Sequence, residues 1–238
     1  MTQEKPIQQK ESIKEFLESF QIASERKRLS LLTVLEERVD EILELGSSLM
    51  TGFDTDLCDW APGFILQLIH KTDGNFIKDN LDCQDLSWFT APSEIGFDYS
   101  PLQQYLLSES YEDADRFTSS KLRELAGEKA VKRGYVYFSE VESIPSIDLA
   151  TLNKLWIVYS RGKFGFTVQS KILDSVGGRY DKLWPRIGWK KDGVWTRYPK
   201  SFNWSIDAPN GHMPLVNQLR GVRLMDSLLN HPAFIAKG

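Results

Sequence analysis

The sequence predicts an all-α protein in which an N-terminal helical bundle precedes a second helical domain with long loops. Apolar residues recur at helical spacing through most of the 238-residue chain. No segment before about residue 86 alternates polar and apolar residues as a strand would. A stretch rich in Pro, Gly and aromatic residues, Tyr180–Arg223, interrupts the helical pattern. The length is enough for one large domain or two small ones.

The first domain is predicted over residues 1–88. Its first helix is indicated by apolar residues three and four positions apart: Ile13, Phe16, Leu17 and Phe20. The same spacing indicates a second helical stretch, with Leu31, Leu32, Leu35, Val39, Ile42 and Leu45. Pro62 suits the first turn of a further helix that carries Phe64, Ile65, Leu68 and Ile69.

Residues 87–96 mix Pro, Gly, Ser and Thr and are predicted to link the bundle to a second domain, residues 96–238. Helices are expected there around Leu102–Leu106, Ala114–Leu125, Leu152–Tyr159 and Phe166–Val176, with Asp148 as a cap of the third. The short segment Arg133–Pro145 is predicted to be an irregular connection or a short helix. A last helical segment is expected to follow Pro214, with Leu215, Leu219, Leu228 and Leu229.

The charge is distributed unevenly along the chain. Residues 1–94 hold 18 acidic and 9 basic side chains, whereas residues 179–238 hold 4 acidic and 10 basic ones. This pattern favours an anionic partner for the C-terminal part, although uneven surface charge without consequence explains the counts equally well. The 2 cysteines do not indicate a disulfide framework. The sequence shows neither a signal peptide nor a membrane span, so a soluble, cytoplasmic protein is expected.

Known catalytic patterns do not match this sequence. The 3 histidines form no HExxH motif and no metal-ligand spacing with Cys or carboxylates. There is no Gly-rich phosphate loop and no Gly-x-Ser-x-Gly elbow. The sequence therefore predicts neither an enzyme nor a metal site.

Binding chemistry is better represented, in the stretch Tyr180–Arg223. Four of the 7 tryptophans lie within Trp184–Trp204, interleaved with Lys and Arg. Such a mixture favours a flat apolar ligand with anionic edges, although core packing with solvated cations, or a groove for single-stranded nucleic acid, uses the same residue types. The best candidates for ligand contact are the loop aromatics Trp195, Tyr198 and Phe202, and Asn217, Arg220 and Arg223, which a helix would present on one face. The expected scaffold residues are Trp184, Trp189 and Trp204.

Eight blocks in this sequence follow one another in the order typical of one known family. They are DYSPLQQYL, ADRFTSSKLRELAG, YFSEVESIPSIDLATLNKLW, GKFGFTVQ, LWPRIGW, VWTRYPKSFNW, APNGHMPLVNQLRGVR and HPAF. Over about Gly96 to Phe234 the chain thus resembles the genomes-uncoupled-four family of tetrapyrrole-binding regulators of magnesium chelatase. The N-terminal helical module resembles the extra bundle of the cyanobacterial members.

The resemblance implies a helical core cupping an apolar groove that binds protoporphyrin IX and Mg-protoporphyrin IX. It implies a non-catalytic role in chlorophyll biosynthesis, in which the protein activates magnesium chelatase through the large porphyrin-binding subunit of that enzyme. The residues matching the family's site motifs are Trp195, Arg197, Tyr198, Phe202, Asn217, Arg220 and Arg223. Similar proteins often have Trp where this chain has Tyr198.

Further expectations concern the ligand and the partners. The aromatic cluster itself contains no histidine, so a metal-free or magnesium porphyrin is expected to suit it better than haem. We expect a monomer without a nucleic-acid partner. Weak peripheral contact with photosynthetic membranes is an alternative, because exposed aromatics would lie beside lysines.

Overall fold

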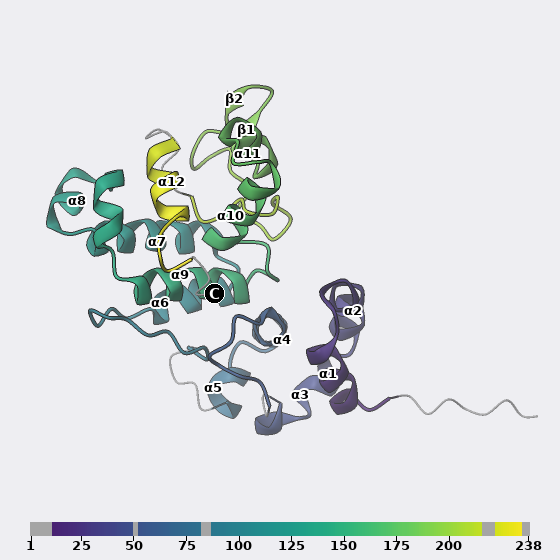
Figure 1. Ribbon diagram of the computed structural model, residues 1–238. Helices are drawn as coiled ribbons and strands as arrows, with labels where there is room; N and C mark the ends of the chain where they lie inside the picture. Colours follow the sequence, from purple (N-terminus) through teal and green to yellow (C-terminus); the bar gives the residue numbers. More distant parts are fainter. Residues whose placement is uncertain (1–10, 50–51, 82–86, 216–221, 235–238) are drawn as a thin grey trace, which may run out of the picture.

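A computed structural model describes residues 11–49, 52–81, 87–215 and 222–234 (Figure 1). The predicted all-α class is confirmed, since strands occupy only a two-residue antiparallel pair in these ranges. The N-terminal elements are α1 (Ile13–Ile22), α2 (Glu25–Glu37), α3 (Val39–Leu43), η1 (Gly46–Ser48), α4 (Trp60–Thr72) and α5 (Phe76–Asn80). Those that follow are α6 (Ser100–Leu107), α7 (Tyr111–Leu125), α8 (Glu128–Arg133), η2 (Phe138–Ser143), α9 (Ser146–Val158), α10 (Phe166–Ser175), α11 (Tyr180–Arg186), β1 (Lys190–Lys191), β2 (Val194–Trp195) and α12 (Val222–Leu229).

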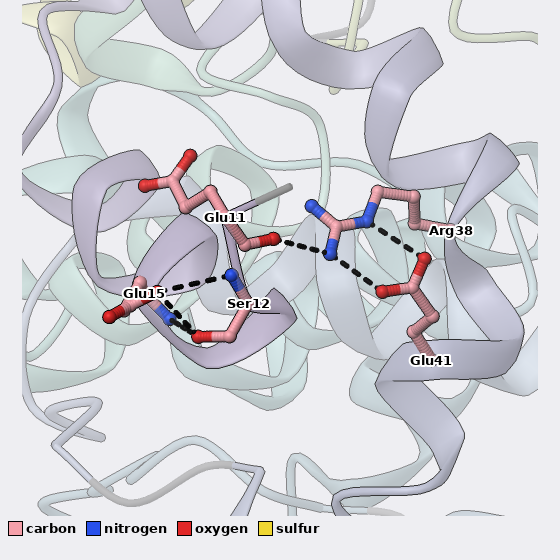
Figure 2. Close-up of polar contacts among 5 residues, drawn as sticks. All are labelled: Glu11, Ser12, Glu15, Arg38 and Glu41. Atoms are coloured by element: carbon pink, nitrogen blue, oxygen red, sulfur yellow. Dashed lines mark hydrogen bonds and ion pairs between the residues drawn. The ribbon is translucent and has the colours of Figure 1, made fainter. Parts of the chain in front are cut away.

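The start of α1 is fixed by a capping box, in which the side chain of each of two residues accepts a hydrogen bond from the backbone N–H of the other (Figure 2). The Ser12 N–H donates to the Glu15 carboxylate at 3.1 Å, and the Glu15 N–H donates to the Ser12 hydroxyl at 3.3 Å. The guanidinium of Arg38, at the junction of α2 and α3, donates to the Glu11 carbonyl at 3.1 Å and pairs with the carboxylate of Glu41. These contacts hold the beginning of α1 against the junction of α2 and α3.

Helix α4 joins the N-terminal helices to the second half of the chain. It is buried along almost its whole length and packs on α9. The Gln67 amide donates to the carbonyls of Leu106 at 2.8 Å and Tyr159 at 2.7 Å. At Gly63 the helices come so close that an added Cβ would lie 2.0 Å from the Val158 carbonyl oxygen. The division of the chain into a first domain, residues 1–88, and a second domain, residues 96–238, stays a prediction. In the structure α4 of the first packs closely on α9 of the second.

The substitution Gly63→Ala is expected to destabilise the protein by about 1–3 kcal/mol, because the added methyl group forces α4 away from α9. Thermal or urea unfolding measures this loss. Gly74→Ala is the matched control, since an added Cβ there lies 3.8 Å from its nearest neighbour, the His70 carbonyl oxygen. Equal stabilities of the two variants would contradict the close packing of α4 on α9.

The predicted linker, residues 87–96, is irregular but lies against α9. The carboxylate of Asp148 accepts hydrogen bonds from the Ser93 hydroxyl at 2.5 Å, the Glu94 N–H at 3.0 Å and the Tyr99 hydroxyl at 2.8 Å. The prediction that Asp148 caps a helix is wrong: α9 has Pro145 at its N-cap, and Asp148 lies in its first turn. Its carboxylate instead holds the linker and the start of α6.

The short segment 133–145 contains the 3-10 helix η2, which confirms the expected short helix. The stretch 180–223 is less irregular than its Pro and Gly content suggests, because it includes α11 and the hairpin β1–β2. In Figure 1 the α8 region and the region of α11, β1 and β2 rise on either side of α12. Helix α12 itself packs against η2 and α10.

Candidate functional site

Two of the expected scaffold tryptophans are confirmed as core residues. The rings of Trp184 and Trp189 are buried and stack with centroids 5.5 Å apart and an interplanar angle of 6°. The Trp189 indole N–H donates to the His212 carbonyl at 2.8 Å. This stack supports the hairpin β1–β2 from below, because Trp195 on β2 packs on Trp184 with centroids 5.5 Å apart.

The hairpin presents Trp195 beside cations. Trp195 is half-buried and pairs across the hairpin with Lys190, whose ammonium lies 4.5 Å from the indole centroid. Next to them is an open basin of about 730 Å³, which is large enough for a drug-sized ligand. Its charged lining residues are all cationic: Lys190, Lys191 and Arg197. The basin therefore favours an anionic ligand that can lie on an indole ring.

Phe202 and Tyr198 have different positions in one aromatic cluster. Phe202 is buried, and its ring stacks on Trp204 at 5.5 Å and lies 4.9 Å from the imidazole of His212. Tyr198 is 42% exposed and meets Phe202 and Trp204 edge-on, each with centroids 5.8 Å apart. Tyr198 is thus the member of this cluster that offers ring surface to a ligand, and Phe202 supports it from inside.

The imidazole of His212 lies beneath Phe202 and is 2% exposed. Its Nδ1 is 2.6 Å from the Ile187 carbonyl oxygen, and its Nε2 is buried without a hydrogen-bond partner among the described residues. Burial lowers the pKa of this imidazole. His212 is therefore a neutral core residue, with Nδ1–H donating to Ile187, and it presents no accessible nitrogen to a ligand in the basin.

The arginine face predicted from Asn217, Arg220 and Arg223 is described only in part. Asn217 and Arg220 lie outside the described residues. Arg223 is exposed in the first turn of α12, and its guanidinium carbon lies 5.5 Å from the ring centroid of Phe138 on η2. The ring of Phe138 is itself 44% exposed. This pair places a cation beside an accessible aromatic surface.

A second cavity, which the sequence did not predict, lies between α7, α8, η2 and α12. It is about 50 Å³ in volume, with an apolar wall that includes Leu122, Val141, Leu224 and Leu228 and a single charged lining residue, Arg123. At this size it holds at most the edge of a large ligand. Leu215 also lines it, from the segment that follows the aromatic cluster. Only the helical spacing of Leu122 and Leu228 in the sequence hinted at this pocket, and the same spacing is typical of ordinary core residues.

Tyr198 is connected to both cavities through its neighbours. It directly follows Arg197, which lines the basin, and its hydroxyl group interacts with Asp115 on α7. The carboxylate of Asp115 also accepts a hydrogen bond, at 2.6 Å, from the N–H of Leu215, which lines the apolar pocket. Asp115 thus links the loop that carries the exposed Tyr198 ring to a residue of the apolar pocket.

The part of the chain that the structure describes holds neither a cluster of metal-ligating side chains nor a helix suited to span a membrane. There, no three His, Cys, Asp or Glu side chains gather closely enough to hold a metal ion. None of the helices within those ranges has the length and apolar character needed to cross a bilayer.

Comparisons with known proteins agree on one family. A family model described as GUN4-like matches residues 92–232. A Ycf53-like protein of Synechocystis is 39% identical over 234 residues, which covers 96% of this chain and 99% of that protein. A chloroplastic tetrapyrrole-binding protein of Arabidopsis thaliana is 38% identical over 145 residues, covering 57% of this chain and 55% of the relative.

Two solved structures are similar in fold. The structure of GUN4 from Chlamydomonas reinhardtii has a TM-score of 0.59 and 38% identity, and the match covers 63% of this chain and 99% of that one. The ligand-free structure of Arabidopsis thaliana GUN4 has a TM-score of 0.54 and 38% identity, covering 60% and 98%.

Proposed function

Because the chain belongs to the GUN4-like family, we propose that it binds protoporphyrin IX and Mg-protoporphyrin IX without catalysing a reaction on them. The name of the plant relative, a tetrapyrrole-binding protein, supports this ligand class. The observation in this chain that carries the proposal is the exposed aromatic ring of Tyr198, which directly follows Arg197 of the cationic basin and is linked through Asp115 to Leu215 of the apolar pocket. A porphyrin is a flat apolar disc with two carboxylates, so it matches both kinds of surface.

The residues present fit this ligand. Trp195 and Tyr198 offer aromatic surface, and Arg197 and the two hairpin lysines offer charges for propionates. Phe138 and Arg223 repeat the combination of an exposed ring and a cation. Asn217 and Arg220 are proposed to complete the site, as the family motif implies. Phe202 is proposed to act through its support of Tyr198.

The donor set favours a metal-free or magnesium porphyrin over haem. Haem is usually held by an axial His, Met or Cys, or by a deprotonated Tyr, whereas magnesium prefers oxygen ligands and keeps water. Partial burial raises the pKa of Tyr198 and so disfavours its deprotonated form. The one histidine near the aromatic cluster, His212, is buried beneath Phe202 and has no accessible nitrogen. Binding by these residues therefore relies on ring contact and charge.

We further propose an accessory role toward magnesium chelatase, in which the protein acts on the large porphyrin-binding subunit of that enzyme. The family supports a regulatory protein. The sequence offers no catalytic constellation, and the buried His212 gives the basin no accessible general base. A cytoplasmic monomer with at most weak peripheral membrane contact completes the proposal.

Titration with protoporphyrin IX tests the ligand. Quenching of tryptophan emission and a red-shifted Soret band are expected, because Trp195 and Trp184 lie next to the basin. Affinity should fall less than about threefold between 50 and 200 mM salt, since most of the binding energy is apolar. A site for single-stranded nucleic acid would instead lose roughly a hundredfold or more over this range. Haem binding much tighter than Mg-protoporphyrin would contradict the donor-set argument.

A further inference from the structure

A buried carboxylate connects two segments of the candidate site. Asp115 lies on α7 and is 1% exposed. Its Oδ1 accepts a hydrogen bond from the Leu215 N–H at 2.6 Å, although the two residues are 100 positions apart. The Tyr198 hydroxyl group lies close enough to the same carboxylate for each group to shift the pKa of the other. One side chain thus contacts both the loop that carries Tyr198 and the segment that leads toward Asn217 and Arg220.

The position of this carboxylate is unusual, because a buried acid is normally paired with a cation. Arg116, the next residue on α7, is exposed and paired with Glu112, and its charge lowers the pKa of Asp115 only slightly. The net result is a pKa of about 7 for Asp115: burial is the main cause of the rise, the bond from Leu215 and the interaction with Tyr198 oppose it, and Glu112 on the same helix adds to it. These residues are the titratable and polar groups acting on Asp115 from α7 and from the two segments packed against it.

We propose that Asp115 is a positioning residue for the tetrapyrrole site, where it fixes Tyr198 and the backbone at Leu215 on α7. This proposal rests on the proposed function only for the identity of the ligand. Leu215 lines the apolar pocket, and Tyr198 directly follows Arg197, which lines the basin. Release of either segment from Asp115 would therefore change the distance between the exposed ring and the pocket, and so weaken binding of a rigid disc.

The burial of Asp115 also makes its contacts with these two segments depend on pH. When the segments leave α7, Asp115 becomes exposed and its pKa returns toward the ordinary 3.8, whereas in the closed arrangement it is about 7. The closed arrangement binds the proton more tightly, so protonation favours it. The free energy that favours the closed arrangement over the open one is largest below about pH 4. It decreases as the pH rises from about 4 to about 7 and is constant above that.

Hydrogen exchange and ligand binding test this proposal together. In the wild-type protein without ligand, opening at the Leu215 amide should increase at least about tenfold between pH 5 and pH 7, after correction for intrinsic exchange, and level off above pH 7. Asp115→Asn keeps an acceptor for the Leu215 N–H but cannot ionise, so its opening should not vary with pH. Asp115→Ala removes the acceptor and should lose the protection of Leu215 and about tenfold in protoporphyrin affinity.

Asp113→Asn is the matched control, because Asp113 is an exposed acid two residues away on the same helix. It should behave like wild type in both measurements. The proposal is overturned if Asp115→Ala keeps the protection of Leu215, or if the ratio of wild-type to Asp115→Asn opening stays constant from pH 5 to pH 7. Absence of porphyrin binding in the wild-type protein would overturn the proposed ligand. The exchange data would still show whether Asp115 keeps Leu215 on α7.

Discussion

Replacement of Tyr198 by Ala is expected to weaken protoporphyrin binding about five- to thirtyfold, equivalent to roughly 1–2 kcal/mol. Tyr198 is the exposed ring of its cluster, and its neighbours Phe202 and Trp204 hold it edge-on. Its loss removes one apolar face from the ligand and leaves the buried rings in place. Fluorescence quenching and Soret titration measure the affinity. In an assay with purified chelatase subunits, the variant should also stimulate less at limiting porphyrin.

Two further variants sharpen this test. Tyr198→Trp supplies a larger aromatic ring and should bind at least as tightly as wild type, because more apolar surface can contact the ligand. Tyr105→Ala is the control, because Tyr105 is an exposed tyrosine on α6 that lines neither cavity. Equal affinities of Tyr198→Ala and Tyr105→Ala would remove Tyr198 from the site.

Helix positions were the most predictable part of the fold. Apolar spacing located α1, α7 and α10, because a helix at a core surface must repeat its apolar side chains every three or four residues. The helix Tyr180–Arg186 was missed, since it is only 7 residues long and includes Pro185. Its stability comes from Trp184, which stacks on Trp189 and is therefore a tertiary contact that local sequence does not reveal.

The candidate site was predictable in its chemistry but not in its geometry. Trp184 and Trp189 are buried as the sequence predicted for scaffold residues, and Tyr198 is exposed, whereas Trp204, also predicted as scaffold, is only partly buried, like Trp195. The sequence did not distinguish Phe202, whose burial depends on Trp204 and His212 packed on either side. It also gave no sign of Asp115, because an acid in the polar N-terminal half of a helix is ordinarily a solvated residue.

Asp148 is a second buried acid whose partners lie far away in the sequence. An acid near a helix start resembles a cap, and the sequence contains no sign of its three distant donors. The structure buries Asp148 completely and directs Ser93, the Glu94 N–H and Tyr99 at its carboxylate. The side chain thereby binds the connecting segment to α9, which is also the helix that receives α4.

The substitution Asp148→Ala is therefore expected to lower the free energy of unfolding by about 2–4 kcal/mol, because buried donors lose their acceptor. With a urea dependence of about 2 kcal/mol per molar, the unfolding midpoint should fall by roughly 1–2 M. Asp174→Ala, at an exposed acid on α10, should stay within about 0.5 kcal/mol of wild type. Asp148→Asn should be intermediate, since its amide keeps one acceptor oxygen but turns a donor toward Ser93 or Glu94. A midpoint for Asp148→Ala equal to that of Asp174→Ala would show that the connecting segment is held by its apolar contacts, with Phe89 buried against Tyr159 as the main one.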